Sequence, residues 1–246
     1  MGNGEVFAYE TVGTAILILM GAGVVANVVL KNTAGNSGGY LLINFGWGFA
    51  VFAGASVAAP SGAHLNPAVT LGLAVADKVG WGTVPYYVAG QMLGAFIGAV
   101  LAWLAYKKQF DTHDDPRGTR GIFCTAPTVP APAWNVLTEV IGTFVLVIWV
   151  LLSPGAKAAQ DGVPQFGNSA LGYAGVAFVV IGIGNSLGGP TGYAINPARD
   201  LAPRIAYAVL PIRGKGGAEW GYAWVPVVGP LVGGLLAALL YLALPV

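Results

Sequence analysis

Two identical triplets, Asn-Pro-Ala, stand at residues 66–68 and 196–198. An asparagine amide has hydrogen-bond donors and an acceptor, so Asn66 and Asn196 could bind a neutral polar solute. Asparagine is also a good N-cap, and proline suits the first turn of a helix. Each triplet therefore predicts a short helix that starts from an irregular loop. The alternative interpretation is that each asparagine is only a helix cap.

The loops before the two asparagines could supply the matching acceptors. Irregular backbone at membrane depth survives only inside protein or along a water-filled path. Its carbonyl oxygens can then take the place of the water around a neutral solute. We expect this lane of backbone carbonyls from Gly62, Ala63, His64, Gly192, Tyr193 and Ala194. His64 is expected to contribute through its backbone.

Long apolar runs must position these loops. The chain has 246 residues, of which 56% are hydrophobic and 9% charged, whereas soluble domains have about 25% charged residues. About 20 apolar residues cross the hydrocarbon core. Six runs qualify, at residues 6–30, 40–59, 84–106, 134–152, 170–187 and 222–244. Two shorter runs, 66–76 and 196–210, open with the triplets, which predicts an all-α membrane protein of six transmembrane helices plus two re-entrant half-helices.

The two halves of the chain repeat each other. The pattern around Glu10 returns around Glu139, 129 residues later, and Asn66 returns as Asn196, 130 residues later. Each repeat holds three spans, so the second repeat enters the membrane upside down, as in inverted-repeat transporters. We expect one transmembrane domain over residues 1–246, with repeat 1 at about 5–108, a connecting loop at about 109–133 and repeat 2 at about 134–246. The two short helices would then meet with their N-termini, each carrying about +0.5 charge, which would repel protons and cations.

Composition disfavours several other functions. The formal net charge of +1 leaves no footprint for nucleic acid. One cysteine and two histidines cannot build a disulfide within the chain or a cysteine or histidine metal cluster. The sequence has no nucleophile–base constellation, so we expect no enzyme, no metal and no cofactor. Cys124 is expected to be inert, with a reactive thiol near the pore mouth as the alternative.

The segments 61–70 and 192–200 resemble the aquaporin family, and the resemblance covers essentially the whole chain. The glycerol-facilitator branch in particular is similar, through Asp200, Arg204, Pro226 and the loop 121–127. The resemblance implies a channel for glycerol and water, in which facing half-helix dipoles form the barrier already described for aquaporins. It also implies a lipid bilayer, a cell-membrane location and a homotetramer.

By the same resemblance, four residues form the narrowest point: Trp47, Gly184, Tyr193 and Arg199. Arg199 would donate to two hydroxyl groups, while Trp47 and Tyr193 form an apolar corner for the carbon chain. Gly184 would leave the opposite wall open. The register of the first position has Gly46 as its alternative, and the aromatic residues alone would also fit an interface belt or a core.

Glu10 and Glu139 are carboxylates inside apolar spans, where charge is expensive. The resemblance implies that they hold the irregular loops by accepting backbone amide hydrogens; a proton relay is the alternative. Asp200 is expected to pair with Arg204 or to cap a loop.

The sequence gives contradictory indications of which side of the membrane the two termini face. With cytoplasmic termini, the inside connections carry only Lys78 and Lys157, and seven basic residues lie outside, against the positive-inside rule. The resemblance nevertheless favours cytoplasmic termini.

The predicted function is passive conduction of glycerol, small polyols and water without ions or protons. Two alternatives stay open. One is a water-selective or broader pore for urea or ammonia. The other is a proton-coupled carrier, which would need coupling carboxylates at the midplane.

Overall fold

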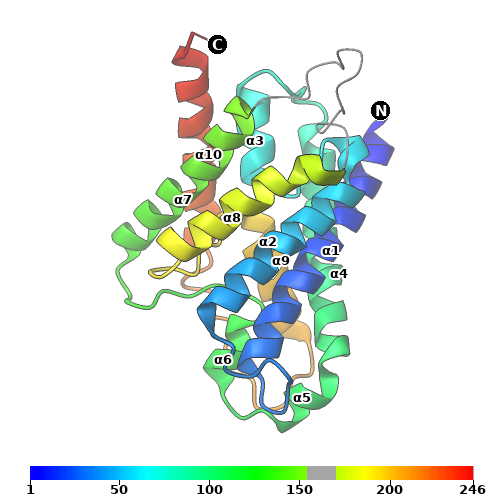
Figure 1. Ribbon diagram of the computed structural model, residues 1–246, viewed down its shortest axis with the longest axis vertical. Helices are drawn as coiled ribbons and strands as arrows, with labels where there is room; N and C mark the ends of the chain where they lie inside the picture. The colour runs from blue at the N-terminus through cyan, green and yellow to red at the C-terminus, as the bar shows by residue number, and fades with distance from the viewer. Residues whose placement is uncertain (154–169, 246) are drawn as a thin grey trace.

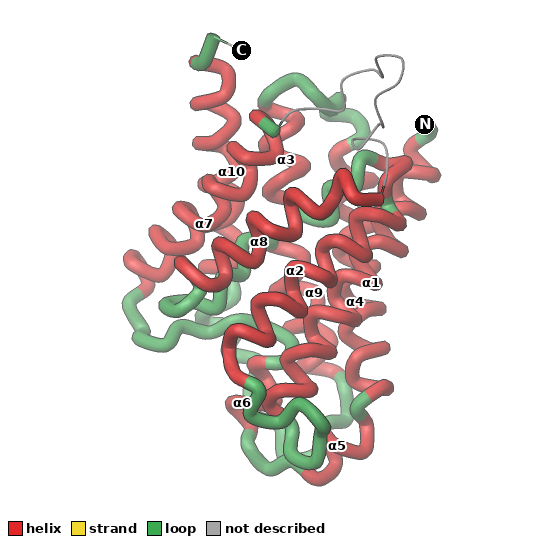
Figure 2. Tube along the Cα trace, viewed as in Figure 1, coloured by secondary structure: helices red, strands yellow, loops and turns green. Residues whose placement is uncertain are grey.

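The computed structural model describes residues 1–153 and 170–245, and within this part of the chain all regular elements are helices (Figure 2). The all-α prediction is therefore confirmed. Lys157 lies outside the described residues. The first and last described residues lie toward the same end of the bundle (Figure 1).

Within residues 1–153 and 170–245, five helices are long and apolar enough to cross a membrane. They are α1 (Asn3–Val29), α2 (Gly39–Val57), α4 (Val84–Ala105), α7 (Pro132–Leu152) and α10 (Val225–Ala243). The run predicted at 170–187 differs from them. It opens with a 3₁₀ turn, η3 (Ala170–Tyr173), and continues as the 14-residue helix α8 (Ala174–Leu187).

Two short helices begin where the sequence predicts them. Helix α3 (Pro67–Val75) follows Asn66, and α9 (Pro197–Val209) follows Asn196. Each asparagine is the N-cap, with an extended backbone, and each proline takes the first helical position. In Figure 1, α3 lies toward the end that holds both termini and α9 toward the opposite end.

The long helices pack in two related groups. Helix α1 contacts α4 and α2, and α7 contacts α10 and α8. The short helices cross over, since α3 contacts α10 and α9 contacts α4. Glycine makes the close crossings feasible: a Cβ on Gly94 would lie 2.3 Å from the Thr11 carbonyl oxygen, and one on Gly233 would lie 2.5 Å from that of Val140.

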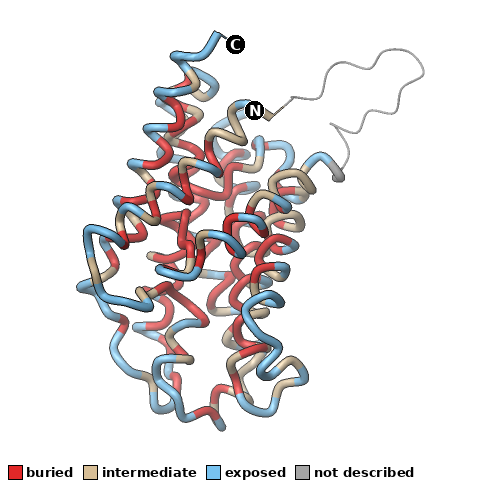
Figure 3. Tube along the Cα trace, turned by 60° about the vertical axis from the view of Figure 1, so that its left-hand side comes forward, coloured by how far each residue is buried: buried red, intermediate tan, exposed pale blue. Residues whose placement is uncertain are grey.

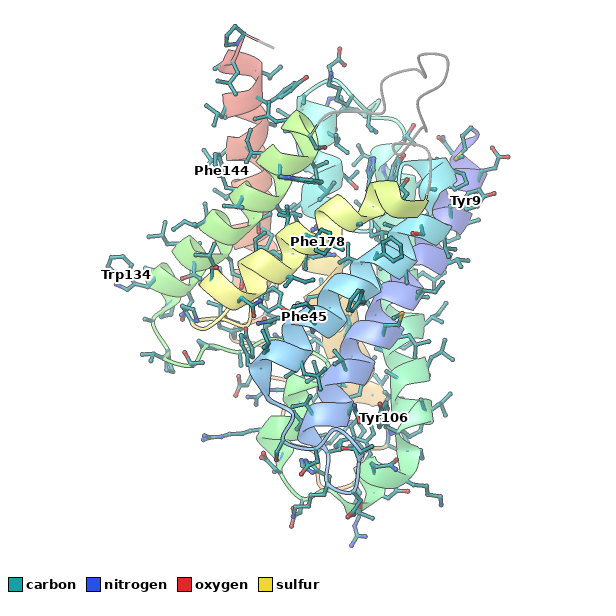
Figure 4. The ribbon with its side chains drawn as sticks, in the orientation of Figure 1. Tyr9, Phe45, Tyr106, Trp134, Phe144 and Phe178 are labelled. Carbon is teal, nitrogen blue, oxygen red and sulfur yellow. The ribbon has the colours of Figure 1, made fainter. Side chains whose placement is uncertain are left out.

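Apolar side chains cover the outside of the bundle as well as its inside. Buried residues line the middle, and exposed ones the periphery (Figure 3). The exposed large side chains include Phe45, Trp134 and Phe178, which point outward in Figure 4. Such a surface would be unstable in water, and it suits a hydrocarbon environment. The chain is an integral membrane protein.

The segment predicted as a connecting loop has structure of its own. It contains α5 (Lys107–Thr112) and α6 (Pro116–Gly121). A further 3₁₀ turn, η1 (Ala59–Ser61), leads into the loop before Asn66. Pro116 takes the first position of α6, and the Asp115 carboxylate caps it by accepting from the Arg117 amide.

Candidate functional site

The two asparagines are tied to each other's loops. The Asn66 amide nitrogen donates to the Ile195 carbonyl oxygen at 2.7 Å, and the Asn196 amide nitrogen donates to the Leu65 carbonyl oxygen at 2.8 Å. Each side-chain oxygen caps its own helix, accepting from Ala68 or Ala198. The N-termini of α3 and α9 are thereby held together. Because an amide nitrogen has two hydrogens, each asparagine keeps one donor beyond this bond.

Glu10 holds the first loop from α1. Its carboxylate accepts from the backbone amides of His64 at 3.0 Å and Leu65 at 2.7 Å. It also accepts from the Ser61 hydroxyl at 2.7 Å and the Gln91 amide at 2.8 Å. The carboxylate is fully buried, and four donors saturate it.

Glu139 holds the second loop in the equivalent way from α7. Its carboxylate accepts from the amides of Ala194 at 3.0 Å and Ile195 at 2.8 Å. Glu139 is buried as deeply as Glu10. Both carboxylates therefore have the bonds that the loop-holding interpretation requires.

Both loop backbones contain several residues in the left-handed conformation. Gly62, Ala63 and Leu65 have positive φ in the first loop, and Gly192, Tyr193 and Ile195 have it in the second. Positive φ is strained for residues other than glycine. The carboxylate bonds to the loop amides stabilise this conformation, since the amides would otherwise be buried without an acceptor.

These turns leave a row of carbonyl oxygens without protein donors. Among the described residues, no hydrogen bond uses the backbone carbonyls of Gly62, Ala63, His64, Gly192, Tyr193 and Ala194. The His64 ring is occupied separately: it stacks on Tyr87 at 3.9 Å, and its Nδ1 lies 3.1 Å from the Thr70 hydroxyl.

A cavity of about 230 Å³ runs beside these groups. Its lining includes both asparagines and five of the six predicted carbonyl residues, with Gly192 outside the lining. Trp47, Tyr193 and Arg199 also line it, whereas Gly184 does not. The remaining wall is largely apolar, with Leu17, Val51, Val69, Leu146 and Val180 among its residues.

Arg199 and Trp47 face each other at this cavity. The Arg199 guanidinium carbon lies 4.1 Å from the centre of the Trp47 ring, which is within cation–π distance. Both side chains are buried, and Nη1 of the Arg199 guanidinium donates no hydrogen bond to any of the described residues. Gly46, the alternative to Trp47, faces away from the cavity, because a Cβ there would lie 2.5 Å from Val24 on α1.

The space beside Gly184 is filled, which corrects one expectation from the sequence. A Cβ on Gly184 would lie 2.7 Å from Oδ1 of Asn44 and 2.8 Å from Cζ of Tyr193. The absent side chain therefore makes room for the tyrosine ring and the asparagine amide. It does not leave an open wall opposite Arg199.

Asp200 forms the ion pair expected with Arg204 and also caps a loop. Asp200 Oδ1 lies 2.7 Å from Nη2 of Arg204, and both side chains are fully buried. Asp200 Oδ2 accepts from the Thr125 amide at 2.6 Å and the Thr125 hydroxyl at 2.7 Å. Arg204 donates back to the carbonyls of Thr125 and Ala218. The network ties two loops to α9.

Pro226 is buried in the first turn of α10.

Several contacting residues were missed from the sequence. Asn44, Tyr87, Gln91 and Thr125 all make bonds around the site. Asn44 and Gln91 did carry a signal, since each is a polar residue inside a long apolar run. Tyr87 carried none, because a span boundary tolerates such a residue. Thr125 lies in the loop 121–127, whose resemblance indicated the family branch but not a contact of this residue.

Cys124 is buried in the loop next to Thr125. Its sulfur lies 3.8 Å from the Arg120 carbonyl oxygen.

Comparisons with known proteins agree on one family. The family model described as "Major intrinsic protein" matches residues 3–241. A protein named "Probable glycerol uptake facilitator protein" from Thermotoga maritima is 50% identical over 96% of this chain and 98% of its own length. A glycerol uptake facilitator protein from Bacillus subtilis is 49% identical over 94% of this chain and 82% of its own.

A solved structure has the same fold. The aquaglyceroporin from Plasmodium falciparum superposes with a TM-score of 0.78 and 30% sequence identity, over 98% of this chain and 96% of that one. With the family model covering nearly the whole sequence, the chain belongs to the major intrinsic protein family.

Proposed function

We propose that this protein is a passive channel that conducts glycerol and related small neutral polyols together with water, and excludes ions and protons. The observation that carries the proposal is the arrangement of Arg199 over Trp47 beside a cavity that both asparagines also line. The names of the two relatives, both glycerol uptake facilitators, support the choice of permeant.

The chemistry of this wall suits a solute with hydroxyl groups on a carbon chain. Arg199 supplies donors in a planar fork. Trp47 and Tyr193 supply an apolar surface on which the carbon atoms can slide. Further along, the second hydrogens of Asn66 and Asn196 and the free loop carbonyls offer donors and acceptors in turn. A hydroxyl group therefore exchanges water for protein partners without leaving bonds unmade.

The same wall is unfavourable for cations. The N-termini of α3 and α9 meet where the asparagines cross, and each helix carries about +0.5 charge there. Arg199 adds a full positive charge. This is the dipole barrier already described for aquaporins, which we assign here to Asn66, Asn196 and Arg199. We also assign the selectivity filter to Trp47, Gly184, Tyr193 and Arg199, with Gly184 acting as the space for Tyr193.

We assign Glu10 and Glu139 to holding the loops. Each carboxylate already accepts at least two hydrogen bonds from loop amides, which a protonated carboxyl would accept more weakly. A coupled carrier would need a carboxylate free to take up and release a proton.

The chain is proposed to act as one channel domain over residues 1–246, built from repeats at about 5–108 and 134–246. The paired bonds from Glu10 and Glu139 and the crossed asparagine bonds support this division. We further propose a cell-membrane location, a homotetramer and cytoplasmic termini. The excess of basic residues at the other end has structural uses: Arg120 pairs with Glu219 at 2.6 Å, and Lys215 donates to three carbonyls at the end of α9.

Stopped-flow swelling of proteoliposomes tests the proposal. Purified protein should speed glycerol entry and water exit equally well with and without a membrane potential or pH gradient. Vesicles without protein and vesicles in an impermeant sugar give the baseline. Water flux without glycerol flux would favour the water-selective alternative, and uphill glycerol accumulation driven by a pH gradient would establish a carrier.

A further inference from the structure

Asn44 lies next to the filter, on the wall behind Tyr193. It stands three residues before Trp47 on α2, so both side chains point to the same side of that helix. Asn44 is fully buried, and its amide nitrogen donates to the Asn185 side-chain oxygen on α8 at 2.7 Å. This bond fixes the amide, with its nitrogen toward Asn185.

Two buried polar atoms at this place have no partner among the described residues: Oδ1 of Asn44 and the hydroxyl of Tyr193. Both side chains press against the same point, because a Cβ on Gly184 would lie 2.7 Å from that Oδ1 and 2.8 Å from Cζ of Tyr193. An acceptor and a hydroxyl therefore stand side by side over a residue with no side chain. Leaving either one unpaired inside a protein costs about 1–3 kcal/mol.

We propose that Asn44 is a positioning residue of the filter: its side-chain oxygen accepts a hydrogen bond from the Tyr193 hydroxyl and so sets where the tyrosine ring stands. The bond needs the two side chains to turn toward each other, since neither atom has a partner in the described structure. Gly184 permits the approach. The apolar corner opposite Arg199 is then held by a polar relay that runs from Asn185 through Asn44 to Tyr193.

The inference deepens the proposed function and rests on it for the role of the ring. It assigns specificity to a contact outside the lumen. A ring fixed at its far end keeps a constant distance from Trp47 and Arg199, whereas a free ring would swing into the lumen and obstruct the larger permeant more than water.

A stability cycle tests the bond without any reference to glycerol. The variants are Tyr193→Phe, Asn44→Leu and the double variant, and the measurement is the melting temperature in detergent. The sign of the first variant decides. If the hydroxyl has no partner, Tyr193→Phe removes a buried unpaired group and raises the melting temperature. If the bond exists, Tyr193→Phe lowers it, because Asn44 loses its donor.

With the bond present, Asn44→Leu should also lower the melting temperature. The double variant should lose less melting temperature than the two single variants added together, since neither polar atom remains unpaired. Additive losses would overturn the proposal. Asn185→Ala is the matched control: it removes the partner of the Asn44 nitrogen and leaves the oxygen free to accept from Tyr193, so its coupling to Tyr193→Phe should be smaller.

The flux arm asks whether the bond sets specificity. In reconstituted protein at equal insertion, Tyr193→Phe and Asn44→Leu should each lower the glycerol-to-water permeability ratio by about threefold to tenfold, the effect of one hydrogen bond. The double variant should fall no further than either single variant. Coupling in stability with an unchanged glycerol-to-water permeability ratio would overturn the positioning role. If the parent protein itself does not conduct glycerol, that result would instead contradict the proposed function.

Discussion

The Arg199 guanidinium carbon lies 4.1 Å from the centre of the Trp47 ring, although the two residues come from different halves of the chain. Helix α2 carries the tryptophan, and the first turn of α9 carries the arginine. The ring stabilises the buried charge by cation–π attraction without using its donors. The donors stay free for a permeant, which is the property a filter for hydroxyl groups requires.

Replacing Arg199 by lysine should lower glycerol permeability more than water permeability. Lysine keeps the charge but loses the planar fork that can serve two hydroxyl groups at once. We expect glycerol permeability to fall by roughly tenfold, the effect of about 1.5 kcal/mol for a lost charge-assisted bond, and water permeability to fall less. Stopped-flow measurement at equal protein per vesicle checks this. Arg213→Lys, at an exposed arginine, is the control and should match the parent. Equal falls in both fluxes would contradict the filter role.

Replacing Gly184 by histidine alone should not give a folded, water-selective channel, but a second substitution should make one possible. The imidazole would overlap Tyr193 and Asn44, whose atoms already lie within 2.8 Å of the new Cβ. We expect low folded yield and reduced flux of both solutes. Gly184→His with Tyr193→Thr removes the ring and leaves only the Asn44 side chain to shift, so it should conduct water, with glycerol permeability reduced about tenfold or more by the narrower polar wall.

Gly182→Ala is the control for this series. It lies two residues away on α8, and a Cβ there would contact nothing within 4 Å. It should fold and conduct like the parent. If Gly184→His alone folds and selects water, the ring of Tyr193 does not occupy the space that the structure gives it.

Much of the architecture could be predicted from the sequence because the signals are local. A proline after an asparagine specifies the start of α3 or α9 within two residues, and an apolar run of about 20 residues specifies a span. The run at 170–187 shows the limit of this reasoning, since hydropathy does not distinguish the 3₁₀ turn of η3 from the α-helical turns of α8.

The filter was predicted only in part, because packing between distant segments decides it. The choice between Gly46 and Trp47 depends on which face of α2 meets the cavity: Trp47 lines it, whereas a Cβ on Gly46 would meet Val24. Whether Gly184 leaves a gap depends on which side chain fills it. The sequence indicates that a glycine is small, but it does not show that Tyr193 and Asn44 take up the space.

Removing the Glu139 carboxylate should damage folding more than selectivity. Glu139→Ala leaves the amides of Ala194 and Ile195 buried without an acceptor, at about 1–3 kcal/mol each. We expect a lower folded yield and a lower melting temperature. Glu139→Gln keeps one oxygen acceptor, so its melting temperature should fall between those of the parent and Glu139→Ala. Glu5→Ala, at an exposed glutamate whose carboxylate accepts the Gly2 amide at the start of α1, is the control and should lose much less stability than Glu139→Ala. A stable Glu139→Ala protein with new proton-dependent transport would favour the relay.

Breaking the buried pair of Asp200 and Arg204 should destabilise the protein far more than breaking an exposed pair. Both side chains are fully buried and 2.7 Å apart, so Asp200→Ala leaves a buried guanidinium without its counter-charge and the Thr125 amide without its acceptor. Loss of one partner of such a pair costs about 3–5 kcal/mol. The pair of Lys31 and Asp114 is 2.5 Å apart with side chains 56% and 78% exposed, and Lys31→Ala should change stability by about 1 kcal/mol or less.

The double variant Asp200→Ala with Arg204→Leu separates charge from loop anchoring. If the lost counter-charge dominates, the double variant recovers much of the melting temperature that Asp200→Ala loses, because no buried charge remains. If the bonds from Arg204 to the Thr125 and Ala218 carbonyls dominate, the double variant melts lower still. We expect recovery, together with a reduced glycerol flux, since Thr125 also packs beside Gly192 in the loop that carries Tyr193. Equal melting temperatures for Lys31→Ala and Asp200→Ala would contradict the assignment of Asp200 as a buried anchor of the loops.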